Sequence, residues 1–154
     1  METKDKRVEQ KKIDPTKYDV ISFNILNATV LEATDPNGLS DPYVRIGKVK
    51  SDSLFASRWL VETEVQEKTL SPTWNYMEEV IIGKDIDRII IELWDKDTFR
   101  NDYIGRAYVD ISELSDYKSF INQGFKIYKN EGDKKEAGTV WVIISKSATF
   151  SDSS

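Results

Sequence analysis

Short segments in which apolar and polar residues alternate recur along most of this chain of 154 residues. In the window "VISFNIL", for example, Ile21, Phe23 and Ile25 alternate with Ser22 and Asn24. A period of two residues is typical of a β-strand with one buried face. Because turn-forming segments such as "DPNG", "SPTW" and "NEGDKKEAG" separate these windows, the sequence predicts many short strands without βα alternation.

Eight windows carry this strand signal, which favours an all-β fold, an eight-stranded antiparallel sandwich. One short helical turn is expected within 111–123, ahead of a strand. Segment 48–60 is interpreted as a long link between strands. We expect its Phe55, Trp59 and Leu60 to pack on the sandwich rather than to contact a partner. The predicted strands are 20–26, 43–46, 61–66, 74–82, 88–94, 104–109, 125–128 and 139–145.

The chain length suits one domain with a hydrophobic core, which we place at residues 18–147. Residues 1–17 hold six basic and four acidic side chains and are expected to form a flexible basic arm. Residues 148–154 are expected to form a flexible tail. The sequence shows neither a signal peptide nor an apolar stretch long enough to span a bilayer, so we expect a cytoplasmic protein.

The sequence contains neither histidine nor cysteine. The usual general base, the thiol nucleophile and the commonest ligands of transition metals are therefore missing. We accordingly predict that the chain is not an enzyme, and a hydrolase that uses carboxylates and a metal ion is the weakest alternative. The formal net charge of −5 argues against nucleic-acid binding, which normally needs a basic face.

Two turn-rich segments, "DPNGLSDPYV" at 35–44 and "WDKDTFRNDYIG" at 94–105, together hold five aspartates. Any one of them alone would be interpreted as a turn former. Because loops at one end of a sandwich come together in space, we expect the five carboxylates to face one another. Such carboxylates need a cation, raised pKa values or splayed loops. Calcium relieves their repulsion best, since it accepts about six to eight oxygen ligands in irregular geometry.

Four motifs in order resemble one known family. The run "LEATDPNGLSDPYVRIG" resembles the first calcium loop and next strand of C2 domains, the calcium-dependent phospholipid-binding modules of synaptotagmins and protein kinase C. The runs "KTLSPTWNYMEEV", "IIIELWDKDTFRNDYIG" and "GTVWVIIS" resemble a later turn and strand, the third loop and the closing strand. The resemblance covers about 18–146. Because the strand pattern begins at "YDVISFNIL", we expect the family's permuted type II topology, which has no extra leading strand.

Transferred to this sequence, the family's calcium ligands fall on the five aspartates and, through main-chain oxygens, on two further positions. The resemblance thereby implies two or more bound Ca²⁺ ions. The third loop is about one residue shorter than in synaptotagmins, which leaves the register of Asp102 open. The predicted metal ligands are Asp35, Asp41, Asp95, Asp97, Asp102, Thr34 and Lys96.

The resemblance implies a reversible membrane-targeting module that docks on anionic, phosphatidylserine-like membranes when calcium rises. A dedicated phosphoinositide site is not expected, because "VETEVQEKT" carries acids where many members have lysines. The alternative is a calcium-modulated adaptor that binds a protein partner without docking on lipid. The residues expected to contact lipid at the loop tips are Pro36, Leu39, Phe99 and Arg100.

Overall fold

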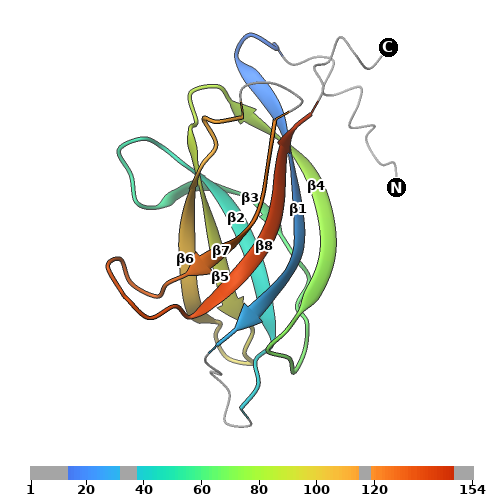
Figure 1. The fold of residues 1–154 in the computed structure, drawn as a ribbon, viewed down its shortest axis with the longest axis vertical. Helices are drawn as coiled ribbons and strands as arrows, with labels where there is room; N and C mark the ends of the chain where they lie inside the picture. Colours follow the sequence, from blue (N-terminus) through green and yellow to red (C-terminus); the bar gives the residue numbers. More distant parts are fainter. Residues whose placement is uncertain (1–13, 32–37, 115–118, 148–154) are drawn as a thin grey trace.

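The computed structural model describes residues 14–31, 38–114 and 119–147. These residues form eight antiparallel strands in two four-stranded sheets that pack face to face, which confirms the predicted sandwich (Figure 1). The sheets have the strand orders β4-β1-β8-β7 and β3-β2-β5-β6. The strands are β1 (Tyr18–Val30), β2 (Pro42–Val49), β3 (Ala56–Glu62), β4 (Thr73–Gly83), β5 (Arg88–Asp95), β6 (Asp102–Asp110), β7 (Phe120–Ile127) and β8 (Gly138–Lys146).

Within the described residues no strand precedes β1, and the closing strand β8 lies between β1 and β7. This order agrees with the expected permuted topology, which has no extra leading strand. Most of the predicted N-terminal arm and the whole predicted C-terminal tail lie outside the described residues.

Strand β1 shows how the alternating pattern becomes a buried face. In its first part, Phe23 and Ile25 point into the core, as predicted. A β-bulge between Ile25 and Asn27 then interrupts the pairing with both β4 and β8. The bulge adds one residue and shifts the alternation, so that Ala28 and Val30 face the core in the second part of the strand.

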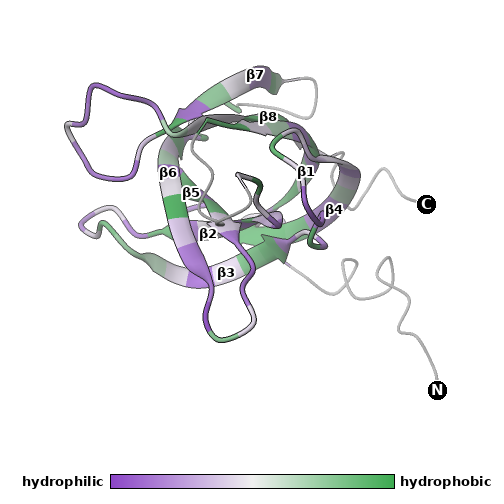
Figure 2. Cartoon of the chain, turned by 90° about the horizontal axis from the view of Figure 1, so that it is seen from below, coloured by the Kyte–Doolittle hydropathy of each residue, from purple (hydrophilic) through white to green (hydrophobic). Residues whose placement is uncertain are grey.

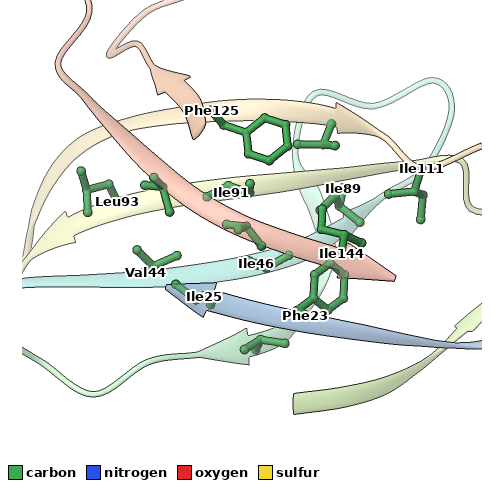
Figure 3. Close-up of a cluster of buried hydrophobic side chains, with 14 of the residues drawn as sticks. Phe23, Ile25, Val44, Ile46, Ile89, Ile91, Leu93, Ile111, Phe125 and Ile144 are labelled. Carbon is green, nitrogen blue, oxygen red and sulfur yellow. The ribbon is translucent and has the colours of Figure 1, made fainter. Parts of the chain in front are cut away.

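The core fills the space between the sheets and receives side chains from all eight strands. Most of them are branched aliphatic residues, and fully burying one contributes about 1.5–3 kcal/mol relative to leaving it exposed. This packing gives the loops at the ends of the strands a rigid base. Figure 3 shows Phe23, Ile25, Val44, Ile46, Ile89, Ile91, Leu93, Ile111, Phe125 and Ile144 in this cluster.

Strands β6 and β7 close one side of the sandwich. Arg106 and Tyr128 exchange two backbone hydrogen bonds, of 2.9 and 3.1 Å, across this side. Gly105 permits the close approach, because a Cβ added there would lie 2.5 Å from Ile127 Cγ2 and 2.9 Å from the Tyr128 carbonyl. A larger residue would therefore push the two sheets apart at this point.

The predicted strand at 61–66 is wrong beyond Glu62, where β3 ends. The segment 63–72 instead crosses between the sheets: the N–H of Thr69 donates to the carbonyl of Ser40 ahead of β2, and the N–H of Val30 in β1 donates to the carbonyl of Leu70. Its backbone thus bonds to both sheets in turn rather than to one neighbouring strand.

The predicted link at 48–60 contains the start of β3, so it is a connection between β2 and β3 only up to residue 55. Leu60 packs against the core, as predicted. Trp59 lies on the outer face of the sheet, where the Arg45 guanidinium sits 3.7 Å from the centre of its ring. The expectation is wrong for Phe55, which is 74% exposed.

Of the helical turn expected within 111–123, the described residues show a turn at residues 112–113, where the N–H of Leu114 donates to the carbonyl of Ile111. Strand β7 already begins at Phe120 and replaces the end of the expected turn, because its residues pair with β8 from Ser145 onward. Residues 115–118 lie outside the described part of the chain.

Replacing Gly105 by alanine is expected to destabilise the fold by about 2–3 kcal/mol, because the new methyl group meets Ile127 and the backbone of Tyr128. The matched control is Gly132→Ala, where the added Cβ meets nothing within 4 Å and only the φ of +84° opposes alanine. That control should lose about 1 kcal/mol. Urea unfolding measures both, and equal losses would contradict the role of Gly105.

Candidate functional site

The predicted metal ligands lie at one end of the sandwich, where β2 begins, β5 ends and β6 begins. In the strand register both Pro42 and Asp102 lie opposite Asp95. This is the lower end in Figure 1, and Figure 2 looks at the molecule from that side, with the two sheets around the interior. The pairing therefore brings together the described parts of the two aspartate-rich segments, as the sequence predicts.

Asp95 is the only buried charged residue among the described residues, with 0% of its surface exposed. It ends β5 two residues after the buried Leu93, so both side chains point between the sheets. Its Oδ1 accepts a hydrogen bond of 2.7 Å from the backbone N–H of Asp41. Burial of a carboxylate is costly without compensating groups, and the N–H of Asp41 supplies one of them at the mouth of the core.

Asp41 connects three segments at this end of the molecule. Besides its N–H bond to Asp95, its Oδ1 accepts a 2.6 Å hydrogen bond from the N–H of Lys68. Its carbonyl accepts a 2.9 Å hydrogen bond from the N–H of Lys96, the residue predicted to offer a main-chain oxygen. The start of β2 is thus fixed against the end of β5 and against the crossing segment 63–72.

Asp97 and Asp102 lie on either side of the exposed tip of the loop between β5 and β6. Asp97 is exposed, and its Oδ1 accepts a 2.6 Å hydrogen bond from the N–H of Thr98. Asp102 is directly opposite Asp95, so both side chains point to the same face of the sheet. The Nε of Arg100 lies 3.9 Å from Asp102 Oδ1, and the arginine side chain is largely exposed.

The described residues include only part of the predicted site. The predicted metal ligands Thr34 and Asp35 and the predicted lipid contact Pro36 lie outside them. In the part of the chain that is described, no three acidic, histidine or cysteine side chains are grouped so as to hold a metal ion. Asp95 and Asp41 are in direct contact and Asp102 is paired opposite Asp95, while Asp97 lies farther along the loop.

The residues expected to contact lipid differ in exposure. Phe99 is 96% exposed, so it does not fold back onto the sandwich. Its neighbour Arg100 is exposed as well, whereas Leu39 is partly buried. The tip of the loop between β5 and β6 therefore presents one aromatic and one cationic side chain to solvent.

Asn101 is a residue of this loop that the sequence analysis does not single out. Its Oδ1 accepts a 3.3 Å hydrogen bond from the N–H of Asp97, and its Nδ2 donates a 2.9 Å hydrogen bond to the hydroxyl of Tyr43. Since Tyr43 is buried in β2, Asn101 anchors the loop to the sheet. No sequence signal finds this link, because it depends on the pairing of β2 with β5.

The outer face of the second sheet stiffens the end of β5. The guanidinium of Arg45 lies between the rings of Trp59 and Trp94, 3.7 and 4.9 Å from their centres. Glu92 Oε1 accepts hydrogen bonds from Arg45 Nε at 2.9 Å and from Trp94 Nε1 at 2.8 Å. These contacts hold Trp94, the residue immediately before Asp95, in one orientation.

The sequence model of the C2 domain matches residues 19–127 of this chain. The chain belongs to the C2 domain family. It is 32% identical over 119 residues to a C2 domain-containing protein of Dictyostelium discoideum, a match that covers 75% of this chain and 60% of that protein. It is 40% identical over 85 residues to the human multiple C2 and transmembrane domain-containing protein 1, covering 53% of this chain and 8% of that protein.

Among solved structures, the fold is similar to the calcium-bound C2 domains of Extended-Synaptotagmin 2. The two structures superpose with a TM-score of 0.65 at 22% identity, covering 83% of this chain and 45% of that one. None of the described residues forms a helix with the length and apolar character needed to cross a membrane.

Stability is expected to fall at alkaline pH because burial, assisted by the Glu62 carboxylate, raises the pKa of Tyr43 above its ordinary value of 10.0. Burial likewise raises the pKa of Tyr103. The folded state therefore holds these phenolic protons more tightly than the unfolded state. The resulting stability is fully present below pH 10 and is lost as the pH rises through the folded-state pKa.

Urea unfolding from pH 8 to pH 11 checks this dependence. Tyr43→Phe and Tyr103→Phe should each lose less stability than the wild type over the alkaline part of the range, since phenylalanine has no proton to lose. Parallel curves for all three proteins would show that these phenols do not cause the alkaline loss.

Proposed function

We propose that this C2 domain binds anionic phospholipid membranes reversibly and in a calcium-dependent manner, through the end of the sandwich that holds Asp95. The observation that carries the proposal is the fully buried carboxylate of Asp95, which bonds the main chain of Asp41 where the loops meet. A charged group at the mouth of an apolar core stabilises little by itself but suits a site for a cation.

The donor groups at this end fit calcium. They are carboxylate and main-chain oxygens, which hard cations prefer, and the chain has no histidine or cysteine to offer a softer metal. Calcium would supply the positive charge that joins the acidic loops to lipid phosphate. The residues proposed to hold two or more Ca²⁺ ions are Asp35, Asp41, Asp95, Asp97 and Asp102, with main-chain oxygens of Thr34 and Lys96.

Charge explains why binding would depend on calcium. Two calcium ions would add four positive charges to a chain whose formal net charge is −5. All four of these charges would lie at one end of the sandwich. Repulsion from an anionic surface there becomes attraction. Because lipid phosphate oxygens would complete the coordination of the ions, calcium and membrane binding should strengthen each other by the same factor.

The loop tip supplies the remaining contacts. Phe99 is available for insertion because it is almost fully exposed, and burying it in lipid contributes about 1.5–3 kcal/mol. Arg100 adds about 1 kcal/mol at an anionic surface. We assign smaller contributions to Pro36 and Leu39 in the first loop. Together these residues give a peripheral contact that reverses when calcium is removed.

Calcium titration calorimetry and vesicle sedimentation test the proposal. The wild type should bind calcium and should sediment with vesicles that contain phosphatidylserine only when calcium is present. Asp97→Asn should weaken calcium binding about tenfold or more, because it removes one ligand charge. The control Asp52→Asn changes an exposed aspartate in the connection between β2 and β3, at the other end of β2, and should bind as the wild type does.

Equal sedimentation with and without calcium would overturn the proposal. Calcium binding without any sedimentation would instead favour the alternative of a calcium-modulated adaptor for a protein partner.

Phe99→Ala is expected to weaken vesicle binding about tenfold or more while leaving calcium affinity in solution unchanged, because the side chain contacts lipid and not the metal. Phe55→Ala is the matched control, since Phe55 is also 74% exposed but lies at the opposite end of β2. Sedimentation at a fixed calcium concentration measures both. An equal loss in the two variants would mean that this end of the molecule is not the one that docks.

A further inference from the structure

Ser40 carries a buried hydroxyl group, and its Oγ has no hydrogen-bond partner in the part of the chain that the structure describes. The residue is 0% exposed, so water does not reach it from outside. Its carbonyl accepts a 2.8 Å hydrogen bond from the N–H of Thr69, so the backbone is fixed while the side chain lacks a partner. Such a group destabilises a fold and is rare in native proteins, so it needs an explanation.

The position of Ser40 places its side chain beside the candidate metal site. The carbonyls of Ser40, Pro42 and Val44 all accept hydrogen bonds from the segment 63–72, as alternate residues of an extended chain do. Alternate residues also share a face, and Pro42 and Val44 are buried between the sheets. Ser40 therefore points to the inner face, as does Asp95, which pairs with Pro42.

We propose that the Ser40 hydroxyl is part of the cation site and donates its hydrogen bond to an oxygen of the cation's coordination shell when calcium is bound. The donor holds that oxygen, from a carboxylate or a water, in the orientation that the ion requires. Groups that support metal ligands in this way typically change metal affinity by about 10–100-fold. This inference rests on the proposed calcium-binding function.

The proposal gives Ser40 two effects of opposite sign. Without calcium the unpartnered hydroxyl destabilises the folded protein, so its removal should not lower stability. With calcium the same group gains its partner and strengthens binding. If Ser40 had only a structural role, its removal would change the stability of the fold but would leave calcium affinity unchanged.

Asn24 provides a matched control elsewhere in the molecule. Its Oδ1 is also buried without a hydrogen-bond partner among the described residues. It lies in β1 between Phe23 and Ile25, whose side chains point into the core, so Asn24 points to the outer face of that sheet. Asn24 thus shares the unpartnered polar atom but not the position at the mouth of the core.

The test measures calcium affinity by calorimetry and the urea midpoint of the calcium-free protein for Ser40→Ala, Ser40→Cys and Asn24→Ala. Ser40→Ala should raise the calcium Kd about tenfold while its calcium-free midpoint stays the same or rises. Ser40→Cys, which keeps the size of the side chain and a weak donor, should lie between alanine and the wild type. Asn24→Ala should bind calcium as the wild type does.

An unchanged calcium Kd in Ser40→Ala, with a wild type that binds calcium, overturns this inference and leaves the proposed function standing. A raised Kd together with a lower calcium-free midpoint also overturns it, because general damage to the fold then explains the loss. A wild type that binds no calcium overturns the proposed function itself and this inference with it.

Discussion

The hydrogen bond between the buried Asp95 carboxylate and the backbone N–H of Asp41 is the contact on which the functional end of this sandwich depends. It joins the residue before β2 to the last residue of β5, two positions that are 54 apart in the sequence, at the point where the apolar core meets the loops. An apolar residue at position 95 would close the core at less cost. The carboxylate there is therefore best explained by the cation that we propose it binds.

Contacts from neighbouring residues support this end of the sandwich. Arg45 and Glu92 hold the tryptophan that precedes Asp95, and Asn101 ties the exposed loop back to Tyr43. A cation site needs such support, because displaced ligands lose affinity for the ion. Among the described residues, the loop tip with Phe99 and Arg100 extends into solvent beyond the buried Asp95, which separates a part that would insert into lipid from a part that would hold calcium.

The negative net charge of the chain would make the proposed membrane docking reversible when calcium is removed. The net charge of −5 opposes contact with an anionic membrane in the absence of calcium, and the apolar contact proposed at the loop tips is small, with Phe99 as its largest exposed side chain among the described residues. Neither term alone favours stable docking. Calcium would change the sign of the electrostatic contribution without requiring any rearrangement of the sheets, so the response can be fast and local.

The sequence by itself predicted the sandwich, most of its strands and the two aspartate-rich segments, since alternation of apolar residues is a local property and the aspartates stand in recognisable turns. Only the tertiary structure decided that β3 lies at Ala56–Glu62, that Phe55 is exposed, and that Asp95 is buried against Asp41. The tertiary structure alone also decided the hydrogen bond between Asn101 and Tyr43 and the unpartnered hydroxyl of Ser40. These features depend on register and burial, which arise from contacts between residues far apart in the chain and leave no local pattern in the sequence.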